Sequence, residues 1–148
     1  MKMRIARHPE ARRQNPLPVY QTNGAVGFDL QSTIDYSLPP GERCIIPTGW
    51  AVEVPEGYEL QIRPRSGTAA KSGITIVNTP GTIDNDYRGE LLVTLLNTDK
   101  VNTFVINKGD RIAQGVVSPI LKVEFEEVDF CELSTTDRGA GGLGSTGA

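Results

Sequence analysis

The stretch "WAVEVPEGYELQIRP", Trp50–Pro64, decides the fold, because apolar and polar side chains alternate on both sides of a short turn. Apolar residues stand at every second position: Val52 and Val54, then Tyr58, Leu60 and Ile62. A period of two is typical of a strand with one buried face, and Pro55–Gly57 supplies the turn. The stretch therefore predicts two strands separated by a turn.

The rest of the chain repeats this organisation. Further strands are predicted in "ELLVTLLN" (90–97) and "RIAQGVVSPI" (111–120), whereas only "SGTAAKSG" (66–73) could hold a short helix. Many short strands with frequent turns indicate an all-β barrel or sandwich, and 148 residues suit one domain. The aromatic residues expected in the core are Trp50, Phe28 and Phe125.

Composition narrows the class of protein. With 38% hydrophobic and 22% charged residues the chain is globular, and no apolar run is long enough to span a membrane. A net charge of −3 argues against a broad nucleic-acid-binding face. Cys44 and Cys131 stand far apart, which argues against a zinc site or a disulfide framework. No apolar segment follows the basic N-terminus, so we expect a cytoplasmic protein without a secretory signal.

The end of the chain differs from the rest. "DRGAGGLGSTGA", residues 137–148, holds five glycines and almost no large side chain, so it cannot pack a core. We expect a domain over 1–136 and a flexible C-terminal arm over 137–148. A Walker-type phosphate loop is rejected, because Ser145 stands where lysine is required and no helix can follow. The arm is either a cover that folds over a phosphate tail with Arg138 or a disordered tail.

Two segments carry candidate chemistry. In "RPRSGTAAKSG" (63–73), Arg65, Ser66 and Gly67 follow a predicted strand, where backbone N–H groups, a hydroxyl and a guanidinium could bind an oxyanion. The alternative is a serine cap beside a surface arginine. In "GTIDNDYRGE" (81–90), a hairpin turn carries Asp84, Asp86 and Tyr87, an unusual cluster for a turn in solvent.

Other candidates are weaker. His8 is the only histidine and is expected to be an exposed loop residue, so Ser–His–Asp chemistry has no basis here. The acids available for catalysis are therefore aspartates: Asp84 and Asp86 in the turn and Asp29 in "GAVGFDL". Gln114, taken alone, is a surface amide near a strand end.

Five segments, taken in order, resemble the five motifs of the trimeric deoxyuridine triphosphatases (dUTP diphosphatases). They are "AVGFDLQS" (25–32), "RPRSG" (63–67), "NTPGTIDNDYRGE" (78–90), "KGDRIAQ" (108–114) and "RGAGGLGSTG" (138–147). The resemblance implies a jelly-roll β-barrel, a homotrimer, and hydrolysis of dUTP to dUMP and pyrophosphate with Mg²⁺. That reaction limits uracil in DNA and supplies dUMP for dTMP synthesis. It also implies that each active site is shared between subunits.

The resemblance assigns roles to the nucleoside-binding residues. Asp84 matches the general base, which activates the water that attacks the α-phosphorus. Tyr87 matches the ring that lies against the deoxyribose and leaves no room for a 2′-hydroxyl. The uracil edge is read by Asn78 together with main-chain groups of Gly81, Thr82 and Ile83.

It assigns the phosphate contacts as well. Arg65, Ser66 and Gly67 would contact the phosphates, and Gln114 the α-phosphate region. The γ end would be bound by Arg138, Ser145 and Thr146, with Gly144 allowing close backbone approach. Mg²⁺ would be held chiefly by phosphate oxygens and waters, with Asp29 reaching it through water.

One residue departs from the family pattern. Leu143 stands where the family usually has an aromatic ring that stacks on uracil, so weaker binding with intact chemistry is expected. Two other functions are weighed: a dCTP deaminase of the same fold, and an interaction protein whose arm is set by a nucleotide. The spacing of Asp84 and Tyr87 argues against the first, and an intact hydrolytic base argues against pure sensing. Nothing in the sequence indicates a further protein partner.

Overall fold

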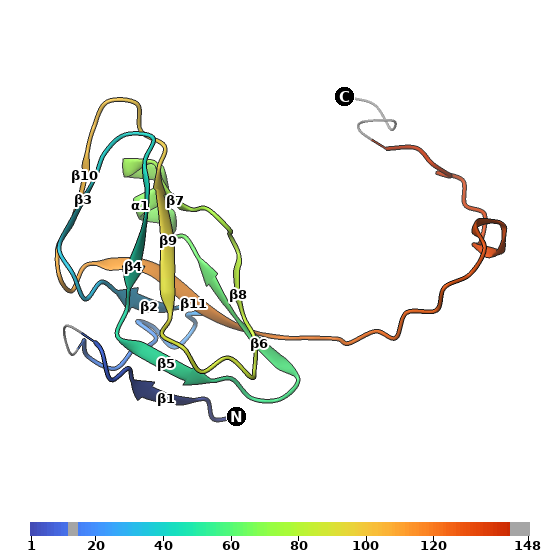
Figure 1. Ribbon diagram of the computed structural model, residues 1–148, viewed down its shortest axis with the longest axis horizontal. Helices are drawn as coiled ribbons and strands as arrows, with labels where there is room; N and C mark the ends of the chain where they lie inside the picture. Colours follow the sequence, from blue (N-terminus) through green and yellow to red (C-terminus); the bar gives the residue numbers. More distant parts are fainter. Residues whose placement is uncertain (12–14, 143–148) are drawn as a thin grey trace.

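The computed structural model describes residues 1–11 and 15–142, which form a β-barrel with one helix and a long C-terminal extension (Figure 1). The predicted all-β class and the short helix are confirmed. The strands are β1 (Arg4–Arg7), β2 (Phe28–Gln31), β3 (Tyr36–Leu38), β4 (Arg43–Pro47), β5 (Trp50–Glu53), β6 (Tyr58–Arg63), β7 (Ile74–Ile76), β8 (Gly81–Ile83), β9 (Leu92–Asn97), β10 (Phe104–Ile106) and β11 (Arg111–Pro119). The helices are α1 (Ser66–Ser72) and the 3-10 turn η1 (Phe130–Glu132).

The alternating stretch at 50–64 forms β5 and β6, as predicted. Its turn contains Gly57 at a φ of 79°, a left-handed conformation that favours glycine. The alternating residues Val52, Val54, Leu60 and Ile62 are all buried. They pack in one core with Trp50 and Phe28, which confirms two of the three aromatic residues expected there.

A four-stranded sheet carries most of the residues of interest. Its order is β2-β11-β6-β8, so the last strand of the barrel lies between two early ones. All strand pairs among the described residues are antiparallel, and the neighbours in this sheet are mostly far apart in sequence. Antiparallel sheets with such crossovers are found in jelly rolls. The three-stranded sheet β4-β9-β7 and the pairs β1-β5 and β10-β3 complete the barrel.

The C-terminal extension leaves the barrel after Ile120, whose N–H donates to Gly57 O at 2.9 Å (Figure 1). Within the described residues that follow Ile120, the hydrogen bonds join neighbours in the extension itself. Phe125 is 92% exposed, so its expected place in the core of its own barrel is wrong. An apolar side chain such as Phe125 predicts a buried position, but the sequence does not show whether its own chain or another chain buries it.

The described helices are short. None of them, over residues 1–11 and 15–142, combines the length and apolar character needed to cross a membrane.

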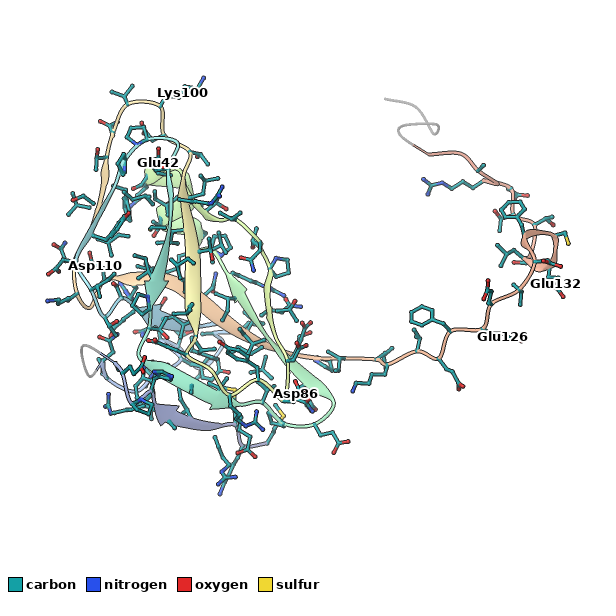
Figure 2. The ribbon with its side chains drawn as sticks, in the orientation of Figure 1. Glu42, Asp86, Lys100, Asp110, Glu126 and Glu132 are labelled. Carbon is teal, nitrogen blue, oxygen red and sulfur yellow. The ribbon has the colours of Figure 1, made fainter. Side chains whose placement is uncertain are left out.

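Figure 2 shows the side chains around the barrel and along the extension.

Gly115 tests how tightly the four-stranded sheet is packed. A Cβ there would lie 2.6 Å from Phe28 Cζ and 3.1 Å from Leu60 Cδ1, both in the core. Because these neighbours are buried, we expect Gly115→Ala to destabilise the protein by about 1–3 kcal/mol. Urea unfolding at fixed protein concentration measures this. Gly24→Ala is the control, since nothing lies within 4 Å of its Cβ position; equal unfolding midpoints for the two variants would contradict the packing account.

Candidate active site

Three strands bring the phosphate-binding candidates to one end of the four-stranded sheet. Gln114 in β11 pairs with Asp29 of β2 on one side and with Arg63 of β6 on the other. Arg65 follows β6 directly, and helix α1 begins at Ser66. Segments that are far apart in sequence thus meet because antiparallel pairing fixes their register.

A β-bulge aims an additional arginine at this end. The register with β2 shifts between Arg111 and Ala113, so Ile112 is the extra residue. Without the shift, Arg111 and Gln114 would face opposite sides of the sheet. With it, Arg111 pairs with Gln31 and Gln114 with Asp29, two positions on one face of β2.

Asp29 holds both arginines. Its Oδ1 accepts from Arg65 Nε at 2.8 Å and its Oδ2 from Arg111 Nη1 at 3.2 Å. Arg65 Nη1 also donates to Arg111 O at 3.4 Å. The Asp29 side chain is only 15% exposed, whereas those of Arg65 and Arg111 are 28% and 48% exposed. A mostly buried carboxylate therefore orients two guanidinium groups whose remaining donors face solvent.

Gln114 is held by a side-chain hydrogen bond. Its Nε2 donates to Pro64 O at 2.9 Å, which ties β11 to the segment that carries Arg65. Gly27 lies close to its other end, since a Cβ there would be 2.5 Å from Gln114 Oε1. The side chain is half-buried rather than a free surface amide.

The start of α1 leaves backbone donors unpaired within the helix. The first helical bond runs from Ala69 N to Arg65 O, so the N–H groups of Ser66, Gly67 and Thr68 have no intrahelical acceptor. Arg65 is the N-cap residue and makes no side-chain cap hydrogen bond. Ser66 is therefore not the cap, and both Ser66 and Gly67 are exposed. The backbone N–H groups at the start of α1 thus remain available to bind an oxyanion, as the oxyanion-binding interpretation of this segment requires.

The hairpin residues lie along β8 and the turn after it. Gly81, Thr82 and Ile83 pair with Ile62, Gln61 and Leu60 of β6. Asn78 precedes them, and its Nδ2 would lie 3.4 Å from a Cβ at Gly81.

Asp84 and Tyr87 form the ends of one turn. Tyr87 N donates to Asp84 O at 3.2 Å, and both side chains are exposed. Arg88 Nη1 donates to the carbonyls of Asn85 and Tyr87 at 2.7 and 2.8 Å, which stiffens the turn. Asp84 also borders a small cavity beside Tyr58, Glu59 and Lys122.

The two groups of residues lie at opposite ends of β6. Because β6 and β8 are antiparallel, Arg65 follows the Arg63 end of β6, whereas Asp84 follows Ile83 beside the Tyr58 end. Six residues of extended strand span roughly 17–20 Å. Figure 1 shows α1 at one end of β6, and Figure 2 labels Asp86, in the Asp84 turn, at the other. One chain does not bring Asp84 and Arg65 to a single phosphate.

Arg138 is distant from both groups. It lies in the C-terminal extension, where its Nε donates to Gly141 O at 2.8 Å. The predicted contacts Leu143, Gly144, Ser145 and Thr146 lie outside the described residues.

Sequence reasoning missed Arg111 and Glu90. Arg111 stands inside the fourth motif segment, but only the bulge turns it toward Asp29. Glu90 ends the third segment, and its Oε1 accepts from Gly49 N at 2.7 Å. His8 was expected in an exposed loop, yet its Nδ1 lies 3.9 Å from Glu90 Oε2 and its side chain is 24% exposed.

Comparison with known proteins identifies the class. The dUTPase family model matches residues 13–147. The chain therefore belongs to the dUTPase family, as its five segments predicted.

Named relatives agree. The deoxyuridine 5′-triphosphate nucleotidohydrolase of Nautilia profundicola is 57% identical over 131 residues, covering 88% of this chain and 90% of the relative. The one from Wolinella succinogenes is 53% identical over 148 residues, covering 99% and 95%. Among solved structures, the dUTPase of Staphylococcus bacteriophage 80alpha with dUpNHpp superposes with a TM-score of 0.87 at 28% identity, covering 99% of each chain.

Asp29→Asn tests whether this carboxylate orients the arginines. The amide keeps the shape but loses the charge that aligns both guanidinium groups, so kcat/KM for dUTP should fall about tenfold to a hundredfold. Glu53→Gln removes a surface partner of Arg4 and serves as the control. Steady-state kinetics measure both variants. Tighter dUTP binding by Asp29→Asn would contradict orientation and favour simple neutralisation of a repelling charge.

Proposed function

We propose that this member of the dUTPase family hydrolyses dUTP to dUMP and pyrophosphate, in sites that subunits of a homotrimer share. The observation that carries the shared site is the separation of Asp84 from Arg65 along β6. A base and a phosphate clamp must act on the same α-phosphorus, and strand geometry keeps them apart in one chain. A second copy that presents its Asp84 turn to this Arg65 completes the site.

The extension supports the same assembly. Leu121, Val123 and Phe125 are 95%, 67% and 92% exposed in this chain, and they alternate with polar residues. Such a period-two segment suits a surface on another subunit. In the proposed trimer residues 1–136 form the packed domain and residues 137–148 the arm. The arm would carry Arg138, Ser145 and Thr146 to the γ-phosphate, with Gly144 close to it.

Asp84 acts as the general base in this proposal. Its carboxylate is exposed at the end of a turn that Arg88 stiffens, so it can reach a substrate held by another subunit. It accepts a proton from a water molecule as that water forms the bond to the α-phosphorus. The bond to the bridging oxygen breaks, and pyrophosphate leaves. Fixing the water in line contributes more than the modest basicity of a carboxylate.

The phosphates meet a locally positive surface. Two positive charges, on Arg65 and Arg111, lie beside one negative charge on Asp29. The Asp29 carboxylate orients both guanidinium groups. The free N–H groups at Ser66 and Gly67 add donors, and Gln114 faces the same end. Preorganised donors of this kind stabilise charge that develops on transferred phosphoryl groups.

Nucleoside selection falls to the hairpin. Asn78 and the main chain of Gly81, Thr82 and Ile83 would pair with the uracil edge, which differs from cytosine in its donors and acceptors. A buried mismatch costs about 1–3 kcal/mol for each unpaired group. Tyr87 would lie against the deoxyribose and exclude a 2′-hydroxyl by its bulk.

The residues fit Mg²⁺ that arrives with the nucleotide. Among residues 1–11 and 15–142, no three His, Cys, Asp or Glu side chains gather to hold a metal ion. Asp29 accepts two arginine hydrogen bonds, and a carboxylate has about four acceptor positions, so it can still bind a metal-bound water. When bound, Mg²⁺ would neutralise charge on the leaving pyrophosphate. The dUTPase of phage phi11 of S. aureus holds a structural Mg(II) ion.

Removal of dUTP, which limits uracil in DNA, and supply of dUMP for dTMP synthesis would be the cellular roles, in the cytoplasm. A pyrophosphate-release assay across dUTP, dTTP, dCTP and UTP tests the reaction. We expect release from dUTP far above the others. Ammonia release from dCTP would instead identify the deaminase of the same fold.

Asp84→Asn tests the base. The amide cannot accept the proton, so the rate should fall about 10²–10⁴-fold. Binding of a non-hydrolysable imido analogue of dUTP, measured by calorimetry, should stay nearly unchanged. Asp86→Asn in the same turn is the matched control and should keep its activity. A rate for Asp84→Asn equal to that of the control would remove Asp84 from the mechanism.

Leu143→Phe tests the departure from the family pattern at a residue outside the described part of the chain. A phenyl ring at this position should stack on uracil, and base–aromatic stacking contributes about 1–3 kcal/mol. We expect a lower KM for dUTP with kcat little changed. Leu143→Met, which enlarges the side chain without an aromatic face, is the control. Equal KM values for the two variants would contradict stacking.

A further inference from the structure

We infer that Gly89 and Glu90 are positioning residues for the Tyr87 ring, and that they thereby set the discrimination between deoxyribose and ribose. The inference rests on the proposed role of Tyr87 and extends it to two residues that do not touch the sugar.

The Tyr87 ring is held from its far end. Its hydroxyl donates to Glu90 O at 3.0 Å, while 40% of the residue is exposed. An exposed aromatic ring without such a bond exchanges between rotamers. The bond to the main chain selects one of them.

Gly89 leaves the space in which the ring lies. A Cβ at this position would be 2.3 Å from Tyr87 Oη, 2.5 Å from Cζ and 3.0 Å from Cε2. All three are ring atoms at the far end of the tyrosine, so no side chain fits at residue 89 while the ring keeps its place. A methyl group there would meet the ring first, because its three nearest atoms all belong to Tyr87.

Glu90 fixes the carbonyl that accepts the Tyr87 hydroxyl. Its carboxylate accepts from Gly49 N at 2.7 Å and is 15% exposed. The next residue is held too, because Leu91 N donates to Trp50 O at 2.7 Å and Thr48 Oγ1 donates to Leu91 O at 2.8 Å. The return of the hairpin is therefore fastened to the turn between β4 and β5.

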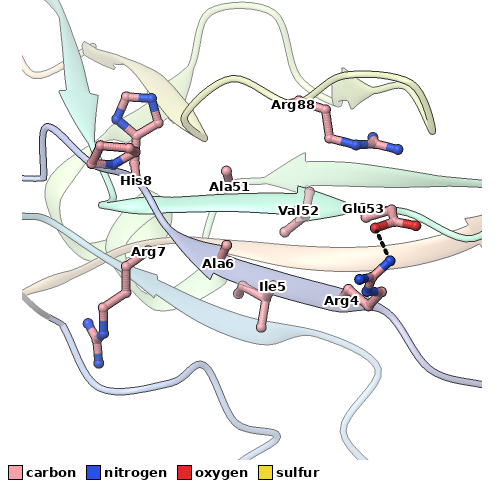
Figure 3. Close-up of a pocket in the computed structure, with 10 residues that line it drawn as sticks. Arg4, Ile5, Ala6, Arg7, His8, Ala51, Val52, Glu53 and Arg88 are labelled. Carbon is pink, nitrogen blue, oxygen red and sulfur yellow. Dashed lines mark hydrogen bonds and ion pairs between the residues drawn. The ribbon is translucent and has the colours of Figure 1, made fainter.

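His8 lies beside this anchor. His8 N donates to Gly49 O at 2.9 Å, and its ring faces the Glu90 carboxylate. Figure 3 shows His8 and Arg88 bordering the adjacent cavity with Arg4, Arg7 and Glu53. The Glu90 anchor thus joins β1, the β4–β5 turn and the hairpin in one cluster.

Steric exclusion of a 2′-hydroxyl requires a Tyr87 ring that keeps its position when ribose approaches. A tyrosine free to rotate would move aside for a 2′-hydroxyl, because its rotamers differ by little energy. A tyrosine held by Glu90 O and seated on Gly89 resists that movement. Selection against ribose then depends on the support of the ring as much as on the ring itself.

Gly89→Ala is the direct test. The ratio of kcat/KM for dUTP to that for UTP should fall by about tenfold to a hundredfold, the scale on which pockets reject an added group. Tyr87→Phe, which keeps the ring but removes its hydrogen bond, should lower the ratio in the same direction. Gly24→Ala, in open space, should leave the ratio unchanged. A purely structural role of Gly89 would lower thermal stability and leave the ratio as in the unmodified protein, which would overturn the inference.

A second measurement needs no substrate. Ring signals of ¹³C-labelled tyrosine, assigned with Tyr87→Phe, report the ring position in the free protein. We expect Gly89→Ala to shift the Tyr87 signals and Gly24→Ala to leave them in place. Unshifted signals in Gly89→Ala would overturn the inference even if the protein hydrolysed no dUTP. If only the proposed function is wrong, the protein will not hydrolyse dUTP, but the Tyr87 signals of Gly89→Ala will still be shifted.

Discussion

The antiparallel pairing of β6 with β8 and β11 is the constraint on which the site depends. It fixes Gln114 beside Asp29 and Arg63, so the residues proposed to bind the phosphates gather at one end of β6. The same pairing sends β8 the other way and leaves Asp84 beside the far end. A rigid strand can neither bend nor shorten to bring the two together. In the proposed function, assembly of several copies brings these two groups of residues together from different chains.

Hydrogen bonds order each of the two groups of residues within the single chain. Asp29 holds two guanidinium groups through charge-assisted hydrogen bonds, which are stronger and more directional than neutral ones. Arg88 ties the carbonyls of the Asp84 turn, and Glu90 anchors its return. Preorganisation of this kind lowers the cost of ordering groups during the reaction. Only the C-terminal extension stands apart from the barrel of its own chain.

Much of this organisation could be predicted from the sequence. The alternation over 50–64 gave both strands and their buried residues, because a half-buried strand has a strict period of two. The segment 66–73 was the one place where a short helix was considered, and the order of five segments identified the family. Single residues behaved less predictably. Phe125 carries the apolar signal of a core residue, yet it lies in the extension, since periodicity marks a face and not its partner.

The contacts missed by sequence reasoning all depend on backbone geometry. A one-residue bulge turns Arg111 toward Asp29, and no local pattern announces it. Glu90 reaches Gly49 across 41 positions, and His8, which follows β1, approaches Glu90. Such pairs follow from register between distant strands. The catalytic and substrate-binding roles assigned to the site residues all stay predictions, as does the metal role of Asp29.

Mixing two inactive variants tests the divided site most directly. One variant carries Asp84→Asn and the other Arg65→Gln, and the two are unfolded, combined in equal amounts and refolded together. If each site takes Arg65 from one subunit and Asp84 from another, roughly a quarter of the sites in random trimers contain both native residues. The account predicts that dUTP hydrolysis returns to about that fraction of the unmodified activity. A mixture as inactive as either variant alone would show that one chain supplies both groups.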